Sequence, residues 1–325
     1  MPFETPADRS ATARHGSLSV EGNRVVDARG EPVAFAGTTF ALGRGPSEFR
    51  RAYNAEMMHY LKSEWGTSLV RVTLPAEGID AYQEDPEAGI IQVEEVVDAA
   101  IREGLYVVVG WDSRGEGIPQ DEAIAFFEQL ARNYGHQPNL IYEISHGREE
   151  MDWSSRLKPA AEAIIAGIRA ADADNLIVVG SPHHSRHVDT ASADPILMDR
   201  NIVYGLRFQA GVDGEDLRNR VRTALANEVP VLATNWTLAD LNRAQPEVWE
   251  EAEAWLRFMR AFNISHIASA EGEMDEAVSI LKPEAPERGP WTDDDLNEAG
   301  RYLRNLFRRW QAPEWEGAAL SAAIQ

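Results

Sequence analysis

Eight short apolar segments recur along this chain, and stretches with helical periodicity separate them. The segments are apolar on both faces, which is typical of parallel strands covered by helices, and each ends in glycine or polar residues. The predicted strands are Val33–Thr39, Ser68–Leu74, Leu105–Gly110, Asn139–Ser145, Asn175–Ser181, Asn201–Gln209, Val229–Trp236 and Ile264–Ala270. This alternation restricts the chain to the α/β class, as a closed (β/α)8 barrel or an open doubly wound sheet.

Helical patterns fill the connections between these strands, except for the short fifth connection at Asp194–Asp199. The predicted helices are Asn54–Trp65, Val93–Glu103, Asp121–Tyr134, Ser154–Ala171, Glu215–Ala226, Pro246–Phe262 and Asp293–Trp310. Eight strands alternating with nearly as many helices are what a (β/α)8 TIM barrel requires. The open sheet is less favoured, because no Gly-x-Gly-x-x-Gly follows the first strand.

The predicted barrel occupies residues 17–312 as a single domain, between a flexible leader at 1–16 and a C-terminal tail at 313–325. At its start, Leu18–Val20 and Arg24–Val26 alternate around a Gly22-Asn23 turn, which predicts a short N-terminal β-hairpin. The first residues lack the basic-then-apolar layout of a signal peptide. We therefore expect a cytoplasmic protein, or a secreted one if the chain is a processed form.

The composition excludes several classes of function. A net charge of -22 argues against nucleic acid and anionic membranes as partners, and no apolar run approaches the roughly 20 residues of a membrane span. The absence of cysteine excludes disulfides, thiolate nucleophiles and Cys-based metal sites. No phosphate-binding loop and no Gly-x-Ser-x-Gly elbow is present, and we predict no cofactor. The acidic, arginine-rich composition is expected of a GC-rich genome or of a salt-adapted organism.

Several stretches, in this order along the chain, match a known family. They are Gly16-Ser-Leu-Ser-Val-Glu-Gly-Asn-Arg-Val-Val-Asp27, Leu69-Val-Arg-Val72, Gly104-Leu-Tyr-Val-Val-Val109, Pro138-Asn-Leu-Ile-Tyr-Glu-Ile144, Asp172-Ala-Asp-Asn-Leu-Ile-Val-Val-Gly180 and Pro230-Val-Leu-Ala-Thr234. On these residues the chain resembles the glycoside hydrolase family 5 cellulases (endoglucanases) over most of its length. The resemblance implies a (β/α)8 barrel with an acid/base glutamate after the fourth strand and a nucleophilic glutamate on the seventh.

The chain departs from this family at both catalytic positions. The family motif Ile-Tyr-Glu-Ile-Ala-Asn-Glu-Pro is Ile141-Tyr-Glu-Ile-Ser-His-Gly-Arg148 here, so Gly147 stands at the acid/base position. The family motif Thr-Glu-Trp-Gly is Thr234-Asn-Trp-Thr237, so Asn235 stands at the nucleophile position. A retaining glycosidase needs two carboxyl groups about 5–5.5 Å apart. Neither Gly147 nor Asn235 supplies one.

Other residues at the strand ends are predicted to contact a ligand. They are Arg71, Trp111, Asp112, His146, His184, Arg207, Asn235, Trp236 and His266. Arg71, His146, Arg207 and His266 would together make the barrel mouth cationic, which favours an anionic saccharide. Alternatively, Arg207 pairs with an acid such as Asp112 and the mouth is neutral.

The remaining acids and histidines near the strand ends receive structural interpretations. Glu143, deep on the fourth strand, is expected to pair with Arg71. His183, His184 and His187 follow the fifth strand, but no further ligand pattern accompanies them, so no metal site is predicted. The loop acids Glu149, Glu150, Glu271 and Glu273 are interpreted as solvated charge.

These observations leave three hypotheses of function. The first is a family 5-like pseudoenzyme that has lost the retaining mechanism and binds a saccharide or a protein partner at the strand-end face. The second is an active O-glycosyl hydrolase on a β-glucan or an acidic polysaccharide, which uses relocated carboxylates such as Asp112. The third is a structural scaffold with a vestigial cleft.

Overall fold

The computed structural model of the chain describes residues 10–41, 55–78, 81–113, 119–146, 151–238, 246–269, 282, 284–286 and 291–310. Eight parallel strands form a closed barrel in chain order, and the last strand pairs with the first. They are β3 (Ala36–Ala41), β4 (Leu69–Pro75), β5 (Tyr106–Ser113), β6 (Leu140–His146), β7 (Ile177–Gly180), β8 (Ile202–Ala210), β9 (Val231–Leu238) and β10 (His266–Ser269). The predicted (β/α)8 barrel is confirmed, with each predicted strand end within three residues of the observed one.

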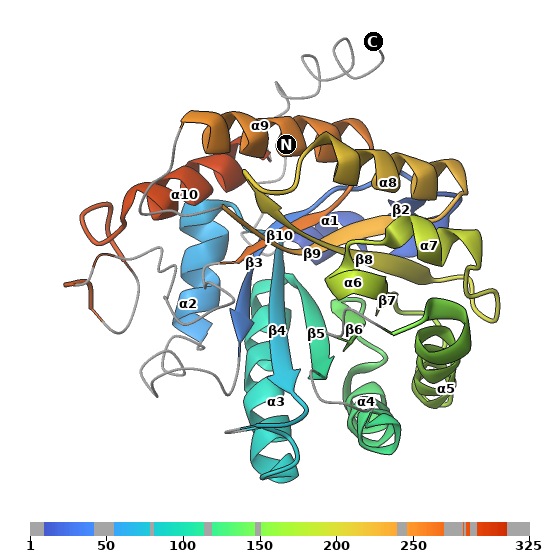
Figure 1. The fold of residues 1–325 in the computed structure, drawn as a ribbon. Coiled ribbons are helices and arrows are strands. Elements are labelled where there is room, and N and C mark those ends of the chain that lie inside the picture. The colour runs from blue at the N-terminus through green and yellow to red at the C-terminus, as the bar shows by residue number, and fades with distance from the viewer. Residues whose placement is uncertain are drawn as a thin grey trace.

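Helices surround the barrel and cover the outer faces of its strands (Figure 1). They are α2 (Ala55–Tyr60) with the π-helical η3 (Leu61–Trp65), α3 (Pro86–Glu103), α4 (Gln120–Tyr134), η4 (Trp153–Leu157) with α5 (Lys158–Arg169), α6 (Pro182–Ser185), α7 (Val188–Ala193), α8 (Glu215–Ala226), α9 (Pro246–Ala261) and α10 (Glu298–Trp310). Helix α3 begins seven residues before the predicted start at Val93. The Asp85 carboxylate caps it by accepting from the Ala88 amide at 3.0 Å, and Pro86 suits its first turn.

The N-terminal segment closes the amino-terminal end of the barrel. The predicted hairpin is present as β1 (Ser19–Glu21) and β2 (Arg24–Val26). Part of the leader expected at residues 1–16 forms a short helix, α1 (Ala11–His15). The Thr12 amide of this helix donates to the Gly104 carbonyl at 3.1 Å. The Tyr106 hydroxyl of β5 donates to the Gly16 carbonyl at 2.6 Å and ties this segment to the strands.

Two apolar layers result from the alternation of side chains along the strands. Inside the barrel, an inner layer packs against the N-terminal segment. It consists of Leu69, Tyr106, Val108, Ile141, Leu176, Val178, Val203, Leu232 and Ile267. The other face of each strand packs on the helices and forms the larger outer core. The inner layer ends before the carboxyl ends of the strands, so the inward positions beyond it can carry polar side chains.

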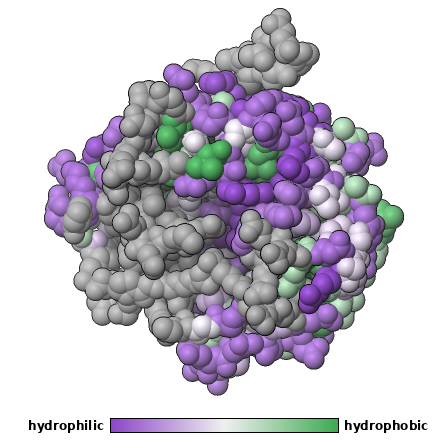
Figure 2. Space-filling model, in the orientation of Figure 1, coloured by the Kyte–Doolittle hydropathy of each residue, from purple (hydrophilic) through white to green (hydrophobic). Residues whose placement is uncertain are grey.

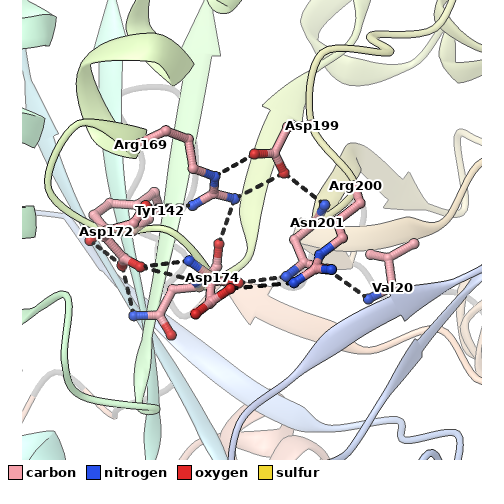
Figure 3. A network of polar contacts seen from close by, with 9 residues as sticks. Val20, Tyr142, Arg169, Asp172, Asp174, Asp199, Arg200 and Asn201 are labelled. Carbon is pink, nitrogen blue, oxygen red and sulfur yellow. Dashed lines mark hydrogen bonds and ion pairs between the residues drawn. The ribbon is translucent and has the colours of Figure 1, made fainter.

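A polar network ties the loops together at the amino-terminal end of the barrel (Figure 3). Arg169 of α5 donates to both carboxylate oxygens of Asp199, at 2.5 and 3.2 Å. The Asn201 amide group donates to the Asp174 carbonyl at 2.6 Å and accepts from the Val20 amide of the hairpin at 3.1 Å. These contacts satisfy the polar groups of the loops before β7 and β8, which gives this network a structural role.

Hydrophilic residues cover most of the described surface in Figure 2. The large apolar side chains that are exposed among the described residues are Ile91, the adjacent Leu197 and Met198, and Val212. No helix within the described ranges is both long and apolar enough to cross a membrane.

Candidate functional site

Above the inner apolar layer, the inward positions of the strands carry polar side chains. We call this set the mouth: Thr39, Arg71, Thr73, Asp112, Glu143, Arg207, Thr234, Asn235 and Ser269. The change from apolar to polar occurs between successive inward positions of one strand. Leu69 of β4 lies in the inner layer, and Arg71, two residues further along, lies in the mouth. In barrels of this architecture, ligands bind at this carboxyl-terminal end of the strands.

A buried ion pair forms the floor of the mouth. The Arg71 Nε donates to Glu143 Oε2 at 2.5 Å, and its Nη2 donates to Oε1 at 3.0 Å, so the contact is bidentate. Arg71 Nη1 also donates to the Thr39 hydroxyl at 3.1 Å. Only 3% of Arg71 and 2% of Glu143 are exposed. Glu143 therefore has the structural pairing expected from the sequence.

A second arginine shares the same carboxylate. Arg207 Nη2 of β8 lies 3.7 Å from Glu143 Oε1. Asp112 is buried near the end of β5, two residues beyond Gly110, which pairs in register with Glu143. The described part of the mouth thus contains two guanidinium groups, both beside Glu143, and a second carboxyl group at Asp112. This balance favours the neutral mouth over the cationic one among the two alternatives that the sequence left open.

Gly110 provides the room for the Glu143 carboxylate. A Cβ atom on Gly110 would lie 2.9 Å from Glu143 Oε2 and 2.8 Å from Thr73 Cγ2. The Arg71–Glu143 pair therefore depends on glycine at position 110. The sequence signal was present in Gly110-Trp111-Asp112, but only the barrel register shows which carboxylate the glycine faces.

Asn235 lies next to a bulge in β9. Leu206 pairs with Ala233 and Arg207 pairs with Asn235, so β9 contains one residue more than β8 at this point. The register with β10 shifts at the same place. Bulges change the direction of a side chain, and they are frequent next to active sites. The Asn235 Oδ1 atom is buried and has no hydrogen-bond partner among the described residues.

Three of the predicted ligand contacts lie on the other side of the strands. Trp111 and His266 have 0% of their surface exposed, and Trp236 has 1%. Trp111 packs edge-on against Tyr82 at 5.0 Å between β5 and the helices. Adjacent residues of a strand point to opposite faces, so Asp112 and Trp111 cannot both enter the mouth. The prediction that Trp111, Trp236 and His266 contact a ligand is therefore corrected: they belong to the outer core.

His184 lies at the rim, on an unusual turn that follows β7. His183, His184 and Ser185 have φ values of 53°, 56° and 64°, a left-handed run without glycine. Arg186 Nη2 contacts Asp213 Oδ2 at 2.8 Å and anchors this turn to the β8–α8 loop. His184 is exposed, whereas the His183 and His187 rings lie 3.9 Å apart. Burial lowers the pKa of His187, and Arg220 and His183 lower it further.

The remaining predicted residues belong to the chain segments that follow β6 and β10 or stand at the end of β6. His146 is the last residue of β6. Gly147, Glu149, Glu150, Glu271 and Glu273 lie outside the described residues. Within the described ranges, no group of three or more His, Asp or Glu side chains is arranged to hold a metal ion.

Comparisons with known proteins agree with the barrel fold. The family model of the cellulases, glycosyl hydrolase family 5, matches residues 26–270. The chain belongs to this family. It is 37% identical to Endoglucanase Z of Dickeya dadantii, over 94% of this chain and 69% of that protein. It is 29% identical to an endoglucanase of Clostridium saccharobutylicum, over 92% and 66% of the two chains. Across five such relatives, the chain spans between 57% and 69% of their lengths.

Solved structures give the same result for the fold of this cellulase-family chain. A structure from Cytophaga hutchinsonii, 31% identical, superposes with a TM-score of 0.85 over 95% of this chain and 99% of the other. The catalytic domain of an endoglucanase from Thermobifida fusca superposes with a TM-score of 0.81 at 23% identity, which concerns the fold alone.

Proposed function

We propose that this member of the cellulase family binds a neutral β-linked glucan in the mouth without cleaving it by the two-carboxylate retaining mechanism. The observation that carries the proposal is Asn235. By the resemblance of Thr234-Asn-Trp-Thr237 to the family motif it stands at the nucleophile position. It lies beside the β9 bulge, and its amide oxygen has no partner among the described residues. An amide can accept and donate hydrogen bonds to sugar hydroxyls, but it lacks the negative charge that attacks or stabilises an oxocarbenium ion.

The chemistry of the other mouth residues supports the same proposal. Gly147, at the acid/base position of the motif, carries no proton donor. Glu143 is held by Arg71 and Arg207, so it is not free to move onto a glycosidic oxygen. The balanced charge of Arg71, Arg207, Asp112 and Glu143 suits an uncharged sugar better than a uronate.

The second candidate is hydrolysis of the same glucan by relocated carboxylates. Its support is the similarity to proteins named as endoglucanases, which favours hydrolysis over binding alone. Within the described residues, Asp112 is the carboxylate of the mouth that could serve, because Glu143 is engaged in its ion pairs.

One set of variants separates the candidates. Binding of cellopentaose by the full chain is measured by titration calorimetry, and release of reducing ends from cellopentaose and carboxymethylcellulose is measured over days. We expect binding without cleavage, weaker binding by Asn235→Ala, and measurable cleavage by the double variant Gly147→Glu/Asn235→Glu.

Two results would reject the first candidate. Cleavage by the wild type that is lost in Asp112→Asn would establish the relocated mechanism. A folded wild type that neither binds nor cleaves these glucans would overturn both candidates and leave the scaffold hypothesis.

A further inference from the structure

His266 lies outside the mouth, and it hydrogen-bonds to the residue that follows Asn235 of the mouth. Trp236 Nε1 of β9 donates to His266 Nδ1 of β10 at 3.1 Å. Trp236 directly follows Asn235 in the chain. Because Nδ1 accepts this bond, the imidazole proton resides on Nε2. Burial, with a smaller contribution from Arg260, lowers the pKa of His266 to about 3, so this tautomer is neutral at physiological pH.

The hydrogen bond joins β9 and β10 where their register shifts. Between His266 and Ala268, β10 advances two residues while its partners on β9 advance three, from Ala233 to Trp236. The bulge interrupts the regular ladder on this side and also toward β8. A strand end that loses ladder hydrogen bonds requires side-chain contacts to hold its direction.

The outer core holds both partners of this hydrogen bond in place. Trp236 stacks on Phe208 with the ring centroids 5.6 Å apart. His266 meets the Trp310 ring of α10 edge-on at 4.3 Å, and Trp310 Nε1 donates to the Ala34 carbonyl at 2.9 Å. Trp236 is thus fixed on one face of β9, which sets the direction of the residue before it on the opposite face.

We propose that His266 is a positioning residue for Asn235, acting through Trp236 and the β9 bulge. The importance of Asn235 for a ligand rests on the proposed function, but its positioning does not. His266 orients the indole, the indole fixes the bulged strand end, and the strand end directs the Asn235 amide into the mouth. His266 touches no ligand in this arrangement.

Three variants test the role of this hydrogen bond. His266→Phe keeps a ring in the outer core but removes the acceptor. His266→Asn places an amide oxygen close to the position of Nδ1 but removes the ring. Tyr204→Phe is the matched control, because it removes one buried hydrogen bond on the outer side of β8, where the Ile196 amide donates to the Tyr204 hydroxyl at 2.8 Å.

The first readout needs no ligand. The side-chain NH2 resonances of Asn235 and the indole N–H resonance of Trp236 are followed by NMR, and are assigned by their loss in Asn235→Asp and Trp236→Phe. We expect His266→Phe to shift both sets of resonances. His266→Asn should keep the Asn235 resonances near their wild-type positions, although it lowers Tm more than His266→Phe does because it removes the ring. Tyr204→Phe should lower Tm without moving either set. Unchanged Asn235 resonances in His266→Phe would overturn the proposal.

The second readout is affinity for cellopentaose. We expect His266→Phe to weaken binding about tenfold, which corresponds to the loss of one hydrogen bond, while His266→Asn and Tyr204→Phe stay within about twofold. If the wild type binds no cellopentaose, the proposed function fails, but the resonances still decide whether His266 positions Asn235. If Asn235→Ala weakens binding, equal affinity of wild type and His266→Phe would overturn the inference alone.

Discussion

Arg71 and Glu143 form a bidentate ion pair that is almost completely buried beneath the mouth, with Nε 2.5 Å from Oε2 and Nη2 3.0 Å from Oε1. Burial of two charges is costly, and only good geometry with further hydrogen bonds offsets the cost. Here Thr39 satisfies a third nitrogen of the guanidinium, and Arg207 approaches the carboxylate from β8. The pair therefore gives the polar mouth a fixed floor.

Removal of one charge of this pair should lower the free energy of unfolding. Glu143→Gln leaves the Arg71 guanidinium buried without its counter-ion, so we expect a loss of about 3–5 kcal/mol in the free energy of unfolding. The control is Glu128→Gln, which breaks the exposed Arg132–Glu128 pair on α4 and should cost about 0.5 kcal/mol or less. Both are measured by guanidinium denaturation. Equal effects of the two variants would contradict the buried pair.

Gly110 should be intolerant of a methyl group. In Gly110→Ala, the new Cβ would lie 2.9 Å from Glu143 Oε2 and 2.8 Å from Thr73 Cγ2, so we expect a loss of about 1–3 kcal/mol from overpacking. Gly205→Ala is the matched control, since it is also on a barrel strand and its Cβ would meet nothing nearer than 3.6 Å. Urea denaturation midpoints compare the two. A Gly110→Ala variant as stable as Gly205→Ala would show that the carboxylate moves aside at little cost.

The alternation of apolar strands and helices predicted the barrel correctly, because each strand is buried on both faces and so has a continuous apolar sequence. The same property prevents the sequence from showing which side chains of a strand point into the barrel and which point to the helices. Trp111 beside Asp112 and Trp236 beside Asn235 were all predicted to contact a ligand, although neighbours on a regular strand point to opposite sides. In each pair the tryptophan packs in the outer core.

Other features of the site depend on the register of neighbouring strands, which the sequence alone does not predict. The bulge at Asn235 is defined by its pairing with Arg207 and by the shift against β10, and neither strand reveals it alone. The contact of Arg207 with Glu143 joins β8 to β6 across the barrel interior. The Trp236–His266 hydrogen bond likewise needs the β9–β10 register.

Acid should destabilise the wild type more than His266→Phe. The pKa of His266 is about 3 in the folded protein and about 6.5 in an unfolded chain, so between these values the unfolded state binds a proton that the folded state does not. The free energy of unfolding must fall as pH is lowered from 6.5, by about 1.4 kcal/mol per pH unit from this group. His266→Phe lacks this contribution. Urea denaturation at pH 7, 6, 5 and 4.5 should show the difference between the two proteins shrinking toward low pH.

Tyr204→Phe is the control for this titration. Burial raises the pKa of Tyr204 to about 12, so its difference from the wild type should stay constant across the same range. A constant difference between the wild type and His266→Phe would mean that His266 titrates normally in the fold.

Salt should stabilise the fold, because the chain has a net charge of -22 with 53 acidic and 31 basic residues. Like charges repel in the compact state, and the Debye length falls from about 10 Å at 0.1 M salt to about 3 Å at 1 M. We expect Tm to rise by several degrees between 0.05 and 1 M KCl, and to rise less in sucrose of equal osmolality. A variant that removes three exposed charges, Glu95→Gln/Glu250→Gln/Asp294→Asn, should have a higher Tm at low salt and a smaller salt response. If KCl lowers Tm or leaves it unchanged, the paired surface charges outweigh the net repulsion.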